Sequence, residues 1–114
     1  MIVINPSSSA LNFILQAAHT SAAGSMQVAW RNITPATPAY IPESIVIASN
    51  GTTSVNLIST PAAGTYSLVD YISYLNNDTG SQQISVRVGS VVVQKVILGV
   101  GERLEYVEGK GWTT

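Results

Sequence analysis

The fold is decided by residues 66–98, which read YSLVDYISYLNNDTGSQQISVRVGSVVVQKVIL. In this stretch, three runs rich in Val, Ile and Tyr are separated by two short segments of Asn, Asp, Gly and Ser. β-Branched and aromatic residues favour extended chain, whereas Gly, Asn and Ser gather in turns. The stretch therefore predicts three consecutive strands, and connections this short allow only antiparallel neighbours.

The first run, residues 66–75, is the longest strand that the sequence predicts. One face is expected to carry Leu68, Ile72 and Tyr74, and the other Val69, Tyr71 and Leu75. Two apolar faces are typical of a strand in the middle of a sheet. Asp70 interrupts this run. Because a buried carboxylate needs a hydrogen-bond partner or a cation, we expect Asp70 to make a structural bond to a loop or to an arginine.

Downstream, a hairpin is predicted over residues 84–98, where apolar and polar residues alternate on either side of Gly89-Ser90. The chain then turns at residues 99–101 and enters a further strand at 104–107. Each of these elements is short and bounded by glycine. This spacing is typical of a sandwich or a barrel.

Upstream, half-buried strands are predicted over residues 11–18 and 26–31, where apolar side chains recur at every second position. Residues 34–42 contain three prolines, which cannot donate to a sheet ladder. We therefore expect a loop there, crossing one end of the sandwich. Next, the Asn50-Gly51 dipeptide lies between two apolar runs and predicts a hairpin with a type I′ turn.

The first ten residues are predicted to be either an extended arm or an edge strand. We favour the edge strand, because strands usually pair with nearby chain. The sequence as a whole predicts an all-β fold of about eight antiparallel strands, arranged as a two-layer β-sandwich or jelly roll in a single domain over residues 1–114.

The composition argues against several classes of function. Only 10% of the residues are charged, and the five basic residues are scattered along the chain, so we expect no direct contact with nucleic acid. There is no cysteine and no apolar run of the roughly 20 residues that a membrane helix needs. Residues 11–18 lack the preceding positive charge of a signal peptide, so we expect assembly in a cytoplasm.

Convergent catalytic chemistry is absent from the pattern, and we predict a protein that is not an enzyme and uses no cofactor or metal. The sole histidine, His19, lies in a small polar turn and is expected to be solvated. The carboxylates of Glu102, Glu105 and Glu108 are expected to be solvated charges of one strand and its turns. The glycine pairs near the C-terminus precede no helix, so we interpret them as turns.

The most specific local pattern lies near the C-terminus. It consists of Gly101, Glu102, Leu104, Tyr106, Gly109, Gly111 and Trp112. We expect Leu104 and Tyr106 to point into one layer, and the last two glycines to reverse the chain at positive φ. That reversal would bring Trp112 back onto the sheet edge and close the core.

The stretch from Leu68 to Trp112, about two-fifths of the chain, resembles the C-terminal half of a diffuse family of small tailed-phage virion proteins. The resemblance rests on a strand ending in an Asn-rich turn, an alternating hairpin, and the Gly-Glu-x-Leu-x-Tyr and Gly-x-Gly-Trp close. Val100 replaces a proline that many relatives carry. The resemblance implies a viral protein of the bacteriophage particle, such as a capsid decoration or cement protein, a head fibre or a tail accessory.

A capsid decoration protein is the expectation that we favour, because the chain is one compact domain without a fibrous repeat. Such a protein would contact copies of itself and the major capsid protein in the virion. Its interface anchors are expected among Trp30, Tyr40 and Tyr66. The alternatives are a tail or fibre accessory protein, and a carbohydrate- or receptor-binding module with a groove that places Trp or Tyr beside Asn and Asp.

Overall fold

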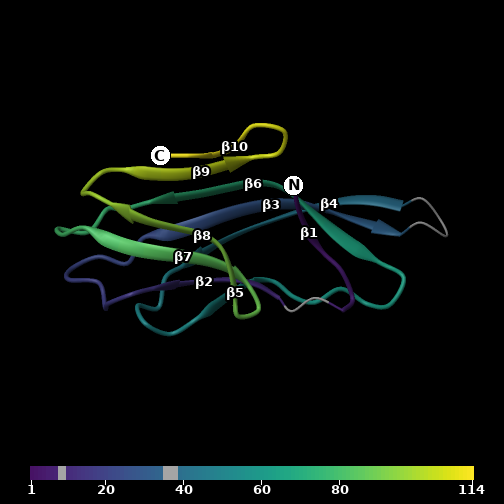
Figure 1. The fold of residues 1–114 in the computed structure, drawn as a ribbon, viewed down its shortest axis with the longest axis horizontal. Helices are drawn as coiled ribbons and strands as arrows, with labels where there is room; N and C mark the ends of the chain where they lie inside the picture. The colour runs from purple at the N-terminus through teal and green to yellow at the C-terminus, as the bar shows by residue number, and fades with distance from the viewer. Residues whose placement is uncertain (8–9, 35–38) are drawn as a thin grey trace.

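The computed structural model describes residues 1–7, 10–34 and 39–114, without the side chains of residues 39 and 40. The described residues form two packed sheets of antiparallel strands (Figure 1). The strands are β1 (Ile2–Ile4), β2 (Leu11–Leu15), β3 (Ser25–Thr34), β4 (Ala39–Ala48), β5 (Val55–Ile58), β6 (Tyr66–Leu75), β7 (Gln82–Val88), β8 (Val91–Leu98), β9 (Arg103–Val107) and β10 (Gly111–Thr113). The all-β sandwich prediction is confirmed, with ten strands instead of about eight.

Six strands form one sheet and four form the other. The six-stranded sheet has the order β10-β9-β6-β3-β4, and β1 joins it by pairing with β6. The four-stranded sheet has the order β5-β2-β7-β8. β6 is therefore central, as predicted, and β7 and β8 form the predicted hairpin. The outer strands are β10 and β4 in the larger sheet, and β5 and β8 in the smaller one.

The N-terminal residues take part in the larger sheet. Ile2–Ile4 pairs with residues 67–69 of β6, and β9 pairs with residues 71–75 further along the same strand. Because β3 occupies the opposite side of β6, β1 and β9 follow one another along one side of it. Residues 2–4 are thus an edge strand.

The core lies between the two sheets and is built from inward-facing side chains of both. Its largest fully buried side chains are Tyr74 of β6 and Phe13 of β2. The two ring centroids are 6.0 Å apart and the rings are tilted by 56°, a favourable arrangement for aromatic side chains. The Tyr74 hydroxyl donates a hydrogen bond to Gln82 Oε1 at 2.6 Å, so its polar atom is satisfied inside the core.

A β-bulge at Asp70 changes which residues of β6 face the core. Ala29 pairs with Tyr71, whereas its neighbour Trp30 pairs with Val69, so Asp70 is an extra residue in β6. The inward positions therefore shift by one across the bulge. Val69 is fully buried, and Leu68 is only half-buried. The prediction that Leu68 shares a face with Ile72 and Tyr74 is wrong because regular alternation does not continue through a bulge.

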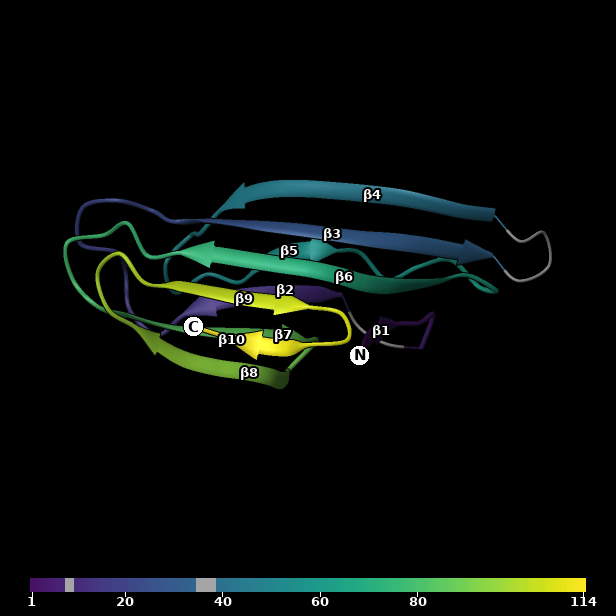
Figure 2. The same cartoon turned by 90° about the horizontal axis from the view of Figure 1, so that it is seen from above.

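The loop predicted over residues 34–42 is also wrong in part. β3 continues to Thr34 and β4 begins at Ala39, so Pro42 lies inside a strand and pairs with Arg31. β4 is the last strand of its sheet, where a residue without an N–H can be accommodated. The prolines at 35 and 38 lie outside the described residues. The β3–β4 pair extends well past the ends of β2, β7 and β8 (Figure 2).

The hairpin predicted at Asn50-Gly51 is wrong, because the strands on its two sides belong to different sheets. β4 lies in the six-stranded sheet and β5 in the four-stranded one, where β5 pairs with β2. A type I′ turn needs positive φ at both central residues, and only Gly51 has it, at 57°. The Gly51 carbonyl instead accepts a hydrogen bond from Leu15 N at 3.0 Å, which fixes the crossing between the sheets.

Candidate functional site

The candidate site is a groove of about 460 Å³ at the end of the sandwich where the six-stranded sheet outruns its partner. β3 and β4 are each ten residues long, whereas β5, whose last residues line the groove, has four. We call this hollow the Trp30 groove. It is lined by Trp30, Asn32, Thr34, Ile41, Leu57, Ile58, Ser59, Thr60, Pro61, Ala62, Thr65 and Ser67.

The inward side of β3 changes character along the strand as cover by the second sheet ends. Met26 and Val28 are fully buried and apolar. Trp30 is half-buried and packs against the core with part of its indole. Beyond it comes Asn32, whose side-chain oxygen accepts a hydrogen bond from Ser67 Oγ at 2.7 Å. The groove floor is therefore an indole followed by amide and hydroxyl groups.

The opposite wall comes from β4 and from the segment that follows β5. Ile41, directly across from Asn32, is 52% exposed. Glu43 lies across from Trp30, and since cross-strand neighbours share a face, its exposed carboxylate stands at the groove's rim. None of the residues that line the groove is charged. Glu43 is thus the charge that the strand pairing places on the same face as Trp30.

Of the three expected anchors, only Trp30 lies in this groove. Tyr66 is half-buried and lines a separate apolar hollow of about 440 Å³ with Val3, Pro6 and Thr65. The side chain of Tyr40 lies outside the described part of the structure. The structure therefore does not bring Trp30 and Tyr66 together in one site.

The C-terminal motif is structural. Leu104 is fully buried, and Tyr106 is 3% exposed. Gly109 and Gly111 have φ values of 85° and 87°, a region that disfavours other residues. The reversal pairs β10 with β9 and places the Trp112 ring 5.0 Å from the Tyr106 ring. Gly101 turns the chain between β8 and β9 at a φ of 80°, and Glu102 accepts a hydrogen bond from the Gly99 N–H.

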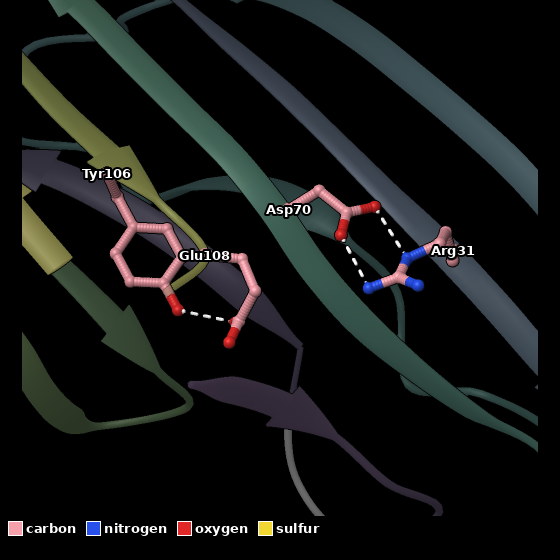
Figure 3. A network of polar contacts seen from close by, with 4 residues as sticks. All are labelled: Arg31, Asp70, Tyr106 and Glu108. Atoms are coloured by element: carbon pink, nitrogen blue, oxygen red, sulfur yellow. Dashed lines mark hydrogen bonds and ion pairs between the residues drawn. The ribbon is translucent and has the colours of Figure 1, made fainter. Parts of the chain in front are cut away.

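Asp70 forms an ion pair with Arg31, as predicted. Two contacts join the side chains, Arg31 Nε to Asp70 Oδ2 at 2.9 Å and Arg31 Nη2 to Asp70 Oδ1 at 2.7 Å (Figure 3). In the same view, the Tyr106 hydroxyl donates to Glu108 Oε2 at 3.0 Å. Burial of the ring, followed by this nearby carboxylate, raises the pKa of Tyr106. The Arg31–Asp70 pair is partly solvated, since its side chains are 23% and 33% exposed.

The sequence interpretation missed Asp78, which is the most heavily bonded carboxylate of the described residues. It accepts hydrogen bonds from the backbone N–H groups of Thr20 at 2.6 Å, Ser21 at 2.7 Å and Ala22 at 3.2 Å. It also accepts from Thr79 N and from the Gln82 side chain. These bonds, the Thr20 bond foremost, hold the pKa of Asp78 far below its ordinary value. Asp78 therefore clamps the loop between β2 and β3, whereas His19 in the same loop is exposed.

A second surface feature is β8, one of the two outer strands of the four-stranded sheet, which we call the β8 edge. Four of its eight residues are large, apolar and exposed. They are Val91, Val92, Val93 and Ile97, with exposed fractions of 65%, 49%, 38% and 67%. Lys95 of β8 and Arg87 of β7 are the only charged residues on the strands of this sheet. The β8 edge is thus apolar with a single positive charge.

Two further observations concern metal ligands and membrane-spanning helices in the described part of the chain. No three of its His, Cys, Asp or Glu side chains are grouped so that they could hold a metal ion. It also contains no helix with the length and apolar content needed to cross a membrane. No protein-family model, curated protein or solved structure matches the chain.

Proposed function

We propose that the protein is a structural component of a bacteriophage virion, of the capsid decoration or cement type, and that it has no catalytic activity. It stabilises the particle through contacts with copies of itself and with other virion proteins. The observation that carries this proposal is the β8 edge. The resemblance of residues 68–112 to small tailed-phage virion proteins supports the same class.

The physical argument starts from what an outer strand offers to another chain. A terminal strand presents backbone donors and acceptors that a neighbouring strand can use, and exposed apolar side chains add buried area when it does. In isolated soluble domains such edges are usually short or rich in charge. β8 has eight residues and one charged side chain. This edge is therefore better suited to a partner than to permanent exposure to water.

The proposal is tested by adding the purified protein to capsids that lack it. We expect binding at a fixed number of copies per particle and greater resistance of the particle to heat. A stable contact requires about 1,000 Å² of buried surface. Binding to isolated tails but not to capsids would reassign the protein as a tail accessory. Failure to bind any virion part would refute the proposal.

A charged double variant of the β8 edge, Val92→Lys with Ile97→Lys, should weaken capsid binding by at least about tenfold. The reason is that two ammonium groups would lose their water at a contact built from apolar side chains. The variant should fold normally, since both side chains are already exposed. Binding is measured by co-sedimentation with particles. Val100→Lys, at a position 61% exposed in a turn, is the matched control and should bind as the unaltered protein does.

A further inference from the structure

We propose that the Trp30 groove is a binding site for a neutral oligosaccharide, whose sugar rings stack on the exposed part of the Trp30 indole. This site is separate from the β8 edge and does not depend on the virion proposal. Three observations support the proposal: the indole, the polar groups beside it, and the absence of charged residues from the groove lining.

The first step of the argument concerns why the groove is open. β3 and β4 continue past β5, so the inward face of their far half has no opposing strand among the described residues. A protein segment filling this space would have to remove water from the half-buried side chains of Asn32 and Thr34, and burying polar groups without new hydrogen bonds is costly. A sugar chain carries its own hydroxyl groups. These hydroxyl groups can make the hydrogen bonds that water otherwise makes to the polar side chains of the groove.

The second step concerns the shape and chemistry of the surface. Small-molecule sites are concave, of about 300–1,000 Å³, with apolar walls and a few polar groups that fix orientation. The Trp30 groove has a volume of about 460 Å³ and combines indole and isoleucine surface with amide and hydroxyl groups. An aromatic face suits the C–H face of a pyranose ring, and the surrounding polar atoms suit its hydroxyls.

The third step concerns charge. An anionic ligand would need a cation, and the lining holds none. The carboxylate of Glu43 lies across the strand pair from Trp30 and on the same face as the indole, whereas the neighbouring Arg31 is paired with Asp70. Among the described residues Glu43 makes no ion pair, so its oxygens are available to accept hydrogen bonds from hydroxyl groups. The same carboxylate repels acidic sugars. The groove therefore selects neutral chains.

Trp30 and Trp112 are the two tryptophans of the chain, which makes a direct test simple. In a Trp112→Phe variant, fluorescence reports on Trp30 alone. We expect a saturable change when neutral hexasaccharides built from glucose or N-acetylglucosamine are added, and none with an oligogalacturonate of similar length. No saturable response to any neutral hexasaccharide up to about 10 mM, which detects dissociation constants in the millimolar range, would refute the proposal.

Variants then locate the site by calorimetric titration of the same sugars. Trp30→Ala should weaken binding at least about tenfold, and the exposed-site variant Glu43→Gln about threefold or more. Glu43→Gln guards against a folding defect in Trp30→Ala, because Trp30 also packs on the core. Tyr66→Ala, in the other hollow, is the control and should bind normally. If Trp30→Ala and Glu43→Gln both bind the sugar as tightly as the unaltered protein does, the sugar binds elsewhere and the assignment is wrong.

Two further measurements distinguish sugar binding in the Trp30 groove from binding at the β8 edge and from peptide binding in the groove. The β8 double variant should bind sugar normally, so failure of the virion proposal and failure of this one can be told apart. A proline-rich peptide is the competing occupant of an aromatic groove. If such a peptide perturbs Trp30 fluorescence and the neutral sugars do not, the groove is a peptide site and the sugar proposal is wrong.

Discussion

Replacing Asp78 with asparagine should lower the melting temperature by on the order of 10 °C. Asparagine has the same shape, but it exchanges one acceptor oxygen for an NH2 group. That group would face N–H donors from Thr20 and Gln82, which now bond Asp78 Oδ2. Donors buried without an acceptor are costly, and Asp78 is only 3% exposed. Differential scanning calorimetry measures the change.

The matched control is the same substitution at the only other aspartate, Asp70. Its ion pair with Arg31 is partly solvated, and pairs of this kind contribute little to stability. Asp70→Asn should lower the melting temperature by no more than a few degrees. Equal losses from the two variants would contradict the clamp that we assign to Asp78.

The clamp also predicts how stability depends on pH. The pKa of Asp78 is lowered in the folded protein from its ordinary value of 3.8, so folding favours the ionised carboxylate. Its contribution is complete above the unfolded pKa, near pH 4, and is lost as the pH falls through the lower folded pKa. Stability should therefore decline below about pH 4 in the natural sequence. In Asp78→Asn this part of the decline should disappear from urea unfolding curves recorded at successive pH values.

Replacing Gly24 with alanine should destabilise the protein by about 2–3 kcal/mol. A Cβ atom at Gly24 would lie 2.5 Å from Tyr74 Oη, 2.6 Å from Tyr74 Cζ and 2.7 Å from the Leu75 carbonyl oxygen. The carbonyl belongs to the central strand, and the Tyr74 ring is packed against Phe13, so neither group has room to move. Denaturant unfolding measures the loss of free energy.

The control for this prediction is Gly80→Ala. The nearest atom to a Cβ at Gly80 is Thr20 Oγ1, at an ordinary contact distance of 3.8 Å. Gly80 does not have positive φ. This variant should change stability by less than about 0.5 kcal/mol. A comparable loss at both glycines would mean that added bulk is not the cause at Gly24.

The elements that the sequence predicts correctly are those whose pattern is local. β6 spans the predicted residues, and the β7–β8 hairpin turns at Gly89-Ser90, because alternation and turn residues lie next to one another in the chain. The hairpin predicted at Asn50-Gly51 is wrong because strand pairing there depends on distant parts of the chain. A turn signal between two strands cannot show whether they pair with each other or with distant strands, and here β5 pairs with β2.

The candidate site could be predicted only in fragments. The sequence marks Trp30 as a candidate interface anchor, yet the groove around it depends on the length of β3 and β4 relative to the strands opposite them. The prolines in residues 34–42 predict a loop, so the sequence does not indicate the full length of β3 and β4. The sequence around Asp78 indicates only a polar loop, because the main partners of Asp78, residues 20–22, lie more than fifty positions away. No local pattern marks such a contact.

The charges of the two sheets differ in sign, and this has a consequence for how the molecule meets another surface. The strands of the four-stranded sheet carry Arg87 and Lys95 and no acid. Those of the six-stranded sheet include Glu43, Asp70 and Glu105, against Arg31 and Arg103. Among the strand residues, charge is therefore weakly separated across the two layers. At physiological salt this field is screened over about 8 Å, so it orients the molecule only in the last step of an encounter, turning the β8 edge toward acidic surfaces.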